Sequence, residues 1–203
     1  MRGAGHRHGG DGGADPASAR WRQENGGGRV EVRNGGPMSV RRLNHAVLYI
    51  REVARSVAFY TEVLGFTVDV EIPGRAAFLS APDSHNDHDL GLFAVGPDAP
   101  GPEGGRIGLY HLAWEVGTLG DLSVIAGRLQ ERGALVGTSD HLVSKSLYAR
   151  DPDGNEFEVM WRVPREDWPG AEVADRLRPL DLAAALERWG PDLLTGAAAG
   201  SAT

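Results

Sequence analysis

The chain has 203 residues, 41% of them hydrophobic, and a formal net charge of −7 at pH 7, which is enough apolar sequence for an ordinary core. The acidic balance and scattered Arg residues exclude a basic nucleic-acid surface, and the lack of a long apolar run or signal block excludes a membrane span, so we expect a cytoplasmic protein. Because cysteine is absent, any metal site must use His and carboxylate ligands.

The first segment, residues 1–37, is rich in Gly and polar residues and has almost nothing apolar to bury. This composition predicts a disordered leader. Met38 stands directly before the first periodic segment, so an alternative is that the leader is an upstream extension of a gene that starts at Met38.

A regular pattern begins at residue 41 and defines a first module, 41–96. The stretch "LNHAVLYI" predicts a strand, and apolar residues from Val53 to Leu64 then recur at helical spacing before Gly65, a C-terminal cap. Three further strand-like runs follow, namely "FTVDVEI", "AAFLSA" and "DLGLFAVG". The module therefore reads as one strand, one helix and three strands.

The same order recurs in a second module, 108–162. It contains "GLYHLAWEV", a helical stripe from Leu122 to Leu129 that ends at Gly133, and then "ALVGTS", "KSLYAR" and "EFEVMWRV". Aligning the elements places His45 over His111 and Phe78 over Tyr148, a degenerate repeat of about 66 residues. We therefore expect an α+β fold in which paired βαβββ modules, within a domain of residues 38–162, form a cupped mixed sheet around a metal site.

Residues 163–203 form a C-terminal tail with one predicted short helix. Asp181 is a plausible N-cap for a helix that carries Leu182, Leu186 and Trp189 and stops at Gly190. The tail is expected to cover a domain edge or to contribute an oligomer contact.

Alternation along the strands sorts residues between the helix side of each sheet and the opposite face. In "EFEVMW" the apolar set is Phe157, Val159 and Trp161, which leaves Glu156 and Glu158 on the opposite face. The same logic leaves His111 on that face in "HLAWEV" and His45 in "NHAVLYI". That face therefore combines apolar walls with a few ionisable groups, as a small-molecule site requires.

Two modules related by a pseudo-two-fold axis would bring His45 and His111 together, and the last strand would add Glu158. Two imidazoles and one carboxylate occupy one face of an octahedral metal, the arrangement of non-haem Fe(II) oxygenases. We therefore expect a metal at His45, His111 and Glu158. His85 and His88, in a loop before the last strand of the first module, and Glu156 receive no role.

With these elements the chain resembles the vicinal oxygen chelate superfamily, which includes glyoxalase I, bleomycin- and fosfomycin-resistance proteins and extradiol dioxygenases. The segment "SDHLVSKSLYARDPDGNEFE" is similar to the signature of the extradiol enzymes. The positions that satisfy the signature in order are His141, Leu147, Tyr148, Asp151, Pro152, Gly154 and Glu158, whereas Ser139 departs from it. The chain is most similar to single-domain, catechol 2,3-dioxygenase-like members.

The resemblance implies an Fe(II)-dependent extradiol dioxygenase, with Mn(II) as the second candidate metal, acting on a catechol-type aromatic diol with O2. By the resemblance His141 is the acid/base, and an imidazole titrates in the range that suits this task. Tyr148 is the residue that donates a hydrogen bond to a substrate oxygen. We also expect the protein to form a homo-oligomer and to bind neither nucleic acid nor a membrane.

Three alternatives remain open at this stage. Glyoxalase-type isomerases use a fourth protein ligand, and its counterpart here falls near Gly91. Fosfomycin-type thiol transferases use two His and one Glu, so only the pair His141 and Tyr148 separates them from the dioxygenases. A metal-free binding protein of the bleomycin-resistance kind needs no ligand triad at all.

Overall fold

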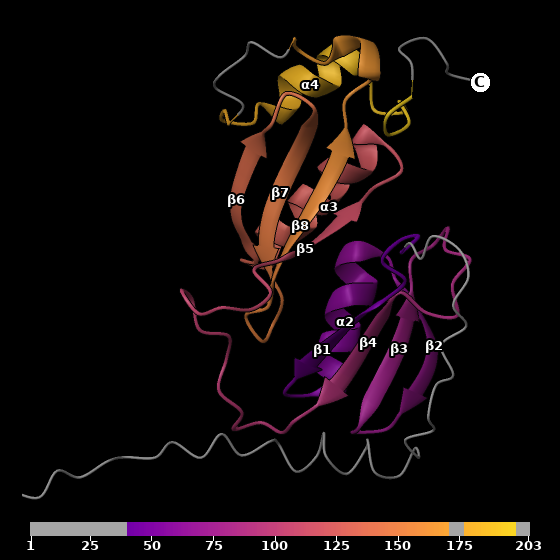
Figure 1. The fold of residues 1–203 in the computed structure, drawn as a ribbon, viewed down its shortest axis with the longest axis vertical. Coiled ribbons are helices and arrows are strands. Elements are labelled where there is room, and N and C mark those ends of the chain that lie inside the picture. Colours follow the sequence, from indigo (N-terminus) through magenta and orange to yellow (C-terminus); the bar gives the residue numbers. More distant parts are fainter. Residues whose placement is uncertain (1–39, 171–176, 198–203) are drawn as a thin grey trace, which may run out of the picture. The chain divides into compact units, whose positions relative to one another are not determined.

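The computed structural model of the protein describes residues 40–170 and 177–197, so the predicted leader lies outside the described part. The order strand, helix, three strands occurs twice, followed by a C-terminal segment with one further α-helix (Figure 1). Within the described residues, no helix has the length and apolar character needed to cross a membrane.

The first module has the predicted elements with small changes at their ends. They are β1 (Ala46–Ile50), α2 (Val53–Leu64), β2 (Thr67–Ile72), β3 (Ala76–Ser80) and β4 (Leu90–Ala94). Helix α2 ends at Gly65, whose φ of 77° is left-handed and whose N–H donates to the Thr61 carbonyl. The predicted glycine cap is therefore confirmed, since glycine adopts this conformation without a Cβ clash.

The second module repeats this series. Its elements are β5 (Leu112–Glu115), α3 (Leu119–Glu131), β6 (Leu135–Asp140), β7 (Ser144–Arg150) and β8 (Glu156–Arg162). Helix α3 begins with a capping box, in which Thr118 and Asp121 exchange hydrogen bonds between side chain and backbone. Strand β5 is shorter than predicted, so His111 lies directly before it rather than inside it.

Each module forms its own four-stranded mixed sheet, and the two sheets have equivalent strand orders. The orders are β1-β4-β3-β2 and β5-β8-β7-β6, with the first and last strands of each module parallel and the remaining pairs antiparallel. This equivalence confirms both the α+β class and the internal repeat.

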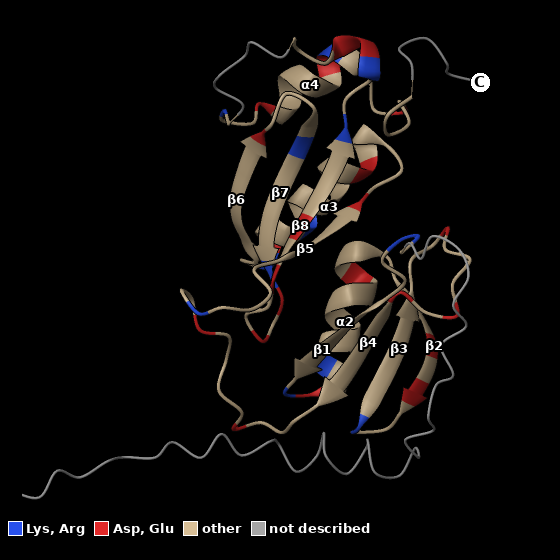
Figure 2. Cartoon of the chain, in the orientation of Figure 1, with Lys and Arg blue, Asp and Glu red and all other residues tan. Residues whose placement is uncertain are grey.

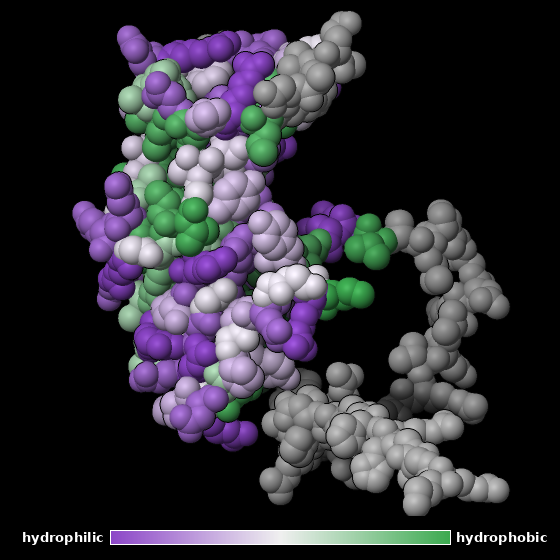
Figure 3. All heavy atoms as spheres, turned by 90° about the vertical axis from the view of Figure 1, so that its left-hand side faces the viewer, coloured by the Kyte–Doolittle hydropathy of each residue, from purple (hydrophilic) through white to green (hydrophobic). Residues whose placement is uncertain are grey.

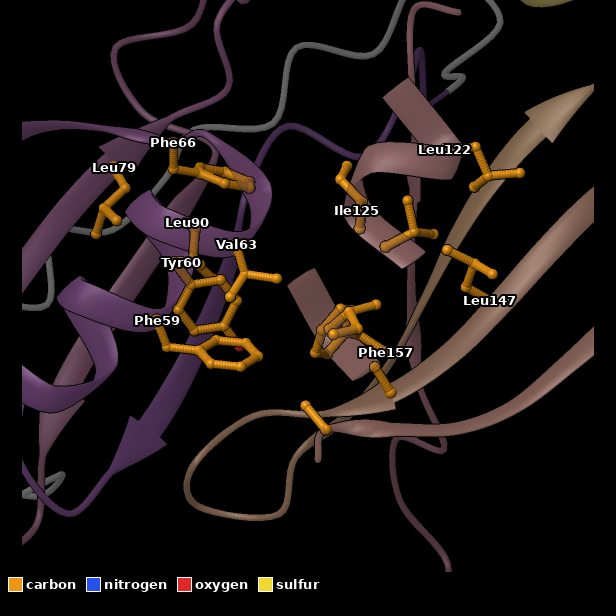
Figure 4. Close-up of a cluster of buried hydrophobic side chains, with 14 of the residues drawn as sticks. Phe59, Tyr60, Val63, Phe66, Leu79, Leu90, Leu122, Ile125, Leu147 and Phe157 are labelled. Carbon is orange, nitrogen blue, oxygen red and sulfur yellow. The ribbon is translucent and has the colours of Figure 1, made fainter. Parts of the chain in front are cut away.

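The core lies between the sheets and their helices, and it confirms the predicted alternation in β8. Phe157, Val159 and Trp161 are at most 2% exposed. Helix α2 of the first module also packs against the second, because Phe59 and Tyr60 point toward Phe157 with ring centroids 6.0 and 6.3 Å away (Figure 4). The two modules therefore share one apolar core.

The β7–β8 turn joins the modules through two buried carboxylates. Asp153 accepts hydrogen bonds from the Arg51 N–H at 3.1 Å and the Arg51 guanidinium at 3.0 Å, and it also pairs with Arg55. Asp151 accepts from the Tyr60 hydroxyl at 3.1 Å. Gly154 closes this turn with a left-handed φ of 92°, and the sequence did not predict the contacts of the two acids.

The C-terminal segment folds over one end of the second module. It contains a short 3-10 helix η1 (Arg165–Asp167) and α4 (Leu182–Trp189), which lies at the end of β6 to β8 in Figure 1. The predicted cap is confirmed, because the Asp181 carboxylate accepts from the Ala184 N–H at 2.9 Å. The ring of Trp161 lies 5.5 Å from that of Trp189 at an angle of 51°, and its N–H donates to the Leu193 carbonyl, so the segment completes the core.

Acidic and basic residues are distributed over the elements of both modules (Figure 2). On the face drawn in Figure 3, apolar residues form small patches among polar ones. The side of the first-module sheet opposite α2 is more apolar, with Val47, Tyr49, Val70 and Ile72 exposed by 52, 57, 52 and 41%. Such contiguous apolar exposure is typical of an interaction surface.

Candidate metal centre

His111 and Glu158 are neighbours because β5 runs parallel to β8. The register pairs Ala113 with Glu158, and His111 immediately precedes β5. The distance between His111 Nε2 and Glu158 Oε2 is 3.2 Å, and their side chains are 24 and 13% exposed. The parity prediction that these two residues share one face of the sheet is therefore confirmed.

The spacing of this pair fits two ligands of one metal ion. Two donors bound at about 2.1 Å and at right angles would lie about 3 Å apart. The second ring nitrogen of His111, Nδ1, is buried and has no hydrogen-bond partner in the described part of the chain. A partly buried imidazole and carboxylate with spare bonding capacity are the donors that a hard or borderline divalent cation requires.

His45 occupies the equivalent position in the first module, directly before β1, but it has different neighbours. Its Nδ1 lies 2.9 Å from Asn44 Oδ1, and its ring centroid is 4.5 Å from that of His88. Across residues 40–170 and 177–197, no three His, Asp or Glu side chains converge closely enough to hold a metal ion. The structure thus brings two of the three predicted ligands together, and the role of His45 stays a prediction.

His88 lies beside His45, although the sequence predicted no role for it. It packs edge-on against Phe78 at 5.1 Å, and its Nδ1 lies 3.0 Å from the Asp87 carboxylate. His85, in the same loop, is exposed. The sequence could not show which of His85 and His88 is the less exposed, because the loop has no alternation of apolar and polar residues.

His141 and Tyr148 form a second polar pair on the same face as Glu158. The distance between His141 Nε2 and the Tyr148 hydroxyl oxygen is 2.8 Å. Tyr148 lies directly opposite Glu158 in the β7–β8 register, and its ring is 5.7 Å from that of His111. Four of the five predicted site residues therefore meet on one sheet face, although their roles stay predictions.

The environment keeps the Tyr148 hydroxyl in its protonated form. Burial raises its pKa above the usual value, and the nearby negative charge of Glu158 raises it further. A tyrosine with a raised pKa remains a hydrogen-bond donor at neutral pH, which is the state that contact with a substrate oxyanion requires.

Glu156 shares the strand face of Glu158 but is engaged elsewhere. Its carboxylate lies 3.3 Å from the guanidinium of Arg150, and the Glu156 side chain is only 15% exposed. Tyr110 also bonds to it, and this hydrogen bond raises the pKa of Tyr110. We therefore assign the Glu156 carboxylate to its contacts with Arg150 and Tyr110 and not to the metal centre.

The fold and this site define a two-module α+β protein with a candidate metal centre whose ligand atoms are nitrogen and oxygen. Residues 42–159 match the Glyoxalase/Bleomycin resistance protein/Dioxygenase superfamily, and the chain belongs to this family. The match covers both modules and ends within β8, so most of the C-terminal segment lies beyond it.

Similar curated proteins include two dioxygenases. The chain is 37% identical over 127 residues to "Catechol-2,3-dioxygenase" of Bacillus subtilis (strain 168), which covers 62% of this chain and 43% of that protein. It is 36% identical over 120 residues to "Biphenyl-2,3-diol 1,2-dioxygenase 3" of Rhodococcus globerulus, covering 58 and 62%. The chain thus matches less than two thirds of the length of each.

Among solved structures, the chain is similar to a glyoxylase/bleomycin resistance protein/dioxygenase domain from Frankia sp. EAN1pec. The two are 26% identical with a TM-score of 0.51, covering 62% of this chain and 94% of that one. A glyoxalase/dioxygenase from Nostoc punctiforme, 23% identical with a TM-score of 0.52, covers 66 and 99% and supports the fold alone.

Proposed function

We propose that the protein is an extradiol dioxygenase that uses Fe(II), or Mn(II) as the second candidate, to cleave a catechol-type ring with O2 in the cytoplasm. The observation that carries this proposal is the pair His141 Nε2 and Tyr148 hydroxyl, 2.8 Å apart, beside His111 and Glu158. The two similar dioxygenases, whose names refer to aromatic diols, support the same reaction class.

In this proposal His111 and Glu158 hold the metal, and His45 is the third ligand. When bound, the metal supplies positive charge that favours the ionised diol and a common site for diol and O2. Both atoms of O2 enter the ring-opened product, a muconic semialdehyde, so the reaction needs no external reductant.

The chain's own residues then manage the proton. His141 Nε2 takes a hydroxyl proton from the diol as general base and returns it during ring opening as general acid. The Tyr148 hydroxyl, which already lies against His141, donates a hydrogen bond to the substrate oxygen that loses the proton. The raised pKa of Tyr148 keeps this donor available.

A substrate screen tests the reaction class. Protein loaded with Fe(II) without air is expected to consume one O2 per catechol, substituted catechol or biphenyl-diol and to form a yellow ring-cleaved product. Oxygen uptake and visible absorbance measure this, with Mn(II)-loaded and metal-free protein as comparisons. Failure of every diol with both metals would refute the dioxygenase proposal and favour a thiol transferase, an isomerase or a binding protein.

We also propose a homo-oligomer in which the open face of the first-module sheet meets the second module of another copy. That face exposes Val47 and Tyr49, and His45 lies directly before the same strand, β1. Reciprocal pairing would bring the His45 of each copy to the His111 and Glu158 of the other. A dimer with two-fold symmetry would then contain two metal sites, each with all three proposed ligands.

Light scattering after size-exclusion chromatography tests this assembly. The chain of 21.6 kDa is expected to elute as a dimer of twice that mass. Tyr49→Lys, which puts a charge in the apolar face, should shift it to the monomer, whereas Val124→Lys, at an equally exposed position on α3, should not. A monomeric parent protein, or a dimer insensitive to Tyr49→Lys, would contradict the pairing.

A further inference from the structure

The β6–β7 turn that carries His141 is held in an unfavourable conformation. Leu142, with φ 68°, is the single non-glycine residue with positive φ in residues 40–170 and 177–197. A leucine in this region is destabilised by the contact of its Cβ with the backbone, and the conformation persists only where its surroundings enforce it. Such strain next to a proposed acid/base residue indicates that the position of the turn matters.

Asp140 is the group that enforces this conformation. One carboxylate oxygen, Oδ1, accepts from the Leu142 N–H at 2.7 Å and from Lys145 Nζ at 2.5 Å. The same oxygen thus connects Leu142 in the turn with Lys145 in strand β7. The turn is closed in addition by the His141 N–H, which donates to the Ser144 carbonyl at 3.0 Å.

The C-terminal segment holds Asp140 from the other side. The Asp140 backbone exchanges two hydrogen bonds with the Arg178 backbone, at 2.8 and 3.0 Å. Lys145 is only 6% exposed, and its ammonium lies 5.2 Å from the centre of the Trp189 ring of α4. The ion pair is therefore enclosed by the segment 178–189, which lies outside the residues matched by the family.

We propose that Asp140 is a positioning residue for His141 and that the C-terminal segment fixes it through Arg178 and Trp189. The inference rests on the proposed function, in which His141 moves the proton. Because His141 follows Asp140 directly, any relaxation of the turn displaces the imidazole from the Tyr148 hydroxyl. Displacement of a reacting group by about 1 Å lowers a rate by about 100-fold.

The double variant Asp140→Ala/Lys145→Met tests this role without leaving an unpaired buried charge. It is expected to lower kcat for ring cleavage by about 100-fold with little change in the KM of the diol. Asp140→Asn/Lys145→Met should recover at least about 10-fold of this loss, because the amide oxygen still accepts the Leu142 N–H. Equal kcat in both double variants would overturn the proposal.

A second measurement does not depend on activity. In protein labelled with 15N-histidine, the ring signals of His141, assigned with His141→Gln, should shift in Asp140→Ala/Lys145→Met and return toward the parent values in the asparagine variant. Asp121→Asn, which weakens the capping box of α3, is the matched control and should leave kcat and these signals unchanged. Unchanged His141 signals in the alanine variant would refute the positioning role, whereas absent ring cleavage by the parent protein would refute only the proposed function.

Discussion

Replacing His111 with alanine is expected to lower ring-cleavage activity at least about 1000-fold and to abolish stoichiometric metal binding. The imidazole and the Glu158 carboxylate, 3.2 Å apart, are the two proposed ligands that lie together on one sheet. Loss of one ligand removes a metal whose charge stabilisation is worth several kcal/mol, and about 4 kcal/mol corresponds to 1000-fold. Metal analysis of anaerobically loaded protein and oxygen uptake measure the two effects.

His85→Ala is the matched control for this prediction, because His85 is an exposed loop histidine in the first module. It should retain both metal and activity. Glu158→Gln, which keeps the size of the side chain but removes its charge, should resemble His111→Ala. If His111→Ala kept its metal and its activity, the metal centre would lie elsewhere.

Much of the fold was predictable because each element carries a local signal. The alternation of Phe157, Val159 and Trp161 with polar residues predicted which side of β8 is buried, and Gly65 predicted the end of α2. The same alternation placed Glu158 on the open face beside His111. These features follow from the periods of helix and strand alone.

The remaining features depend on how distant elements pack, which no local period records. The contact of His45 with His88 follows from the placement of a loop. The hydrogen bonds that Tyr60 donates to Asp151 and Arg51 donates to Asp153 follow from the packing of one module on the other. The enclosure of Lys145 by Trp189 likewise requires the C-terminal segment to return over β7. Sequence patterns predicted these elements but not their contacts.

Asp153→Ala is expected to lower the free energy of unfolding by about 3 kcal/mol, the largest stability effect we predict. The Asp153 side chain is 5% exposed and accepts from the Arg51 backbone and guanidinium, so its loss leaves a donor unsatisfied at the joint between modules. The partial exposure of Arg51 and Arg55, 27 and 43%, lets water compensate in part. Urea unfolding at pH 7 measures the effect, and Asp98→Ala, at an exposed position, should change it by less than about 0.5 kcal/mol.

The difference between the parent protein and Asp153→Ala should also depend on pH in one direction. Burial alone would raise the pKa of Asp153, but the Arg51 hydrogen bonds and the charge of Arg55 outweigh it and hold the pKa below its usual value. A lowered folded-state pKa gives stability that is complete above the unfolded value of about 3.9 and is lost as the pH falls through the folded value. The stability gap should therefore be constant from pH 7 to about pH 5 and shrink toward pH 3. A gap that widened on acidification would mean that Asp153 is held in its neutral form, since the other carboxyl groups are common to both proteins and cancel in the comparison.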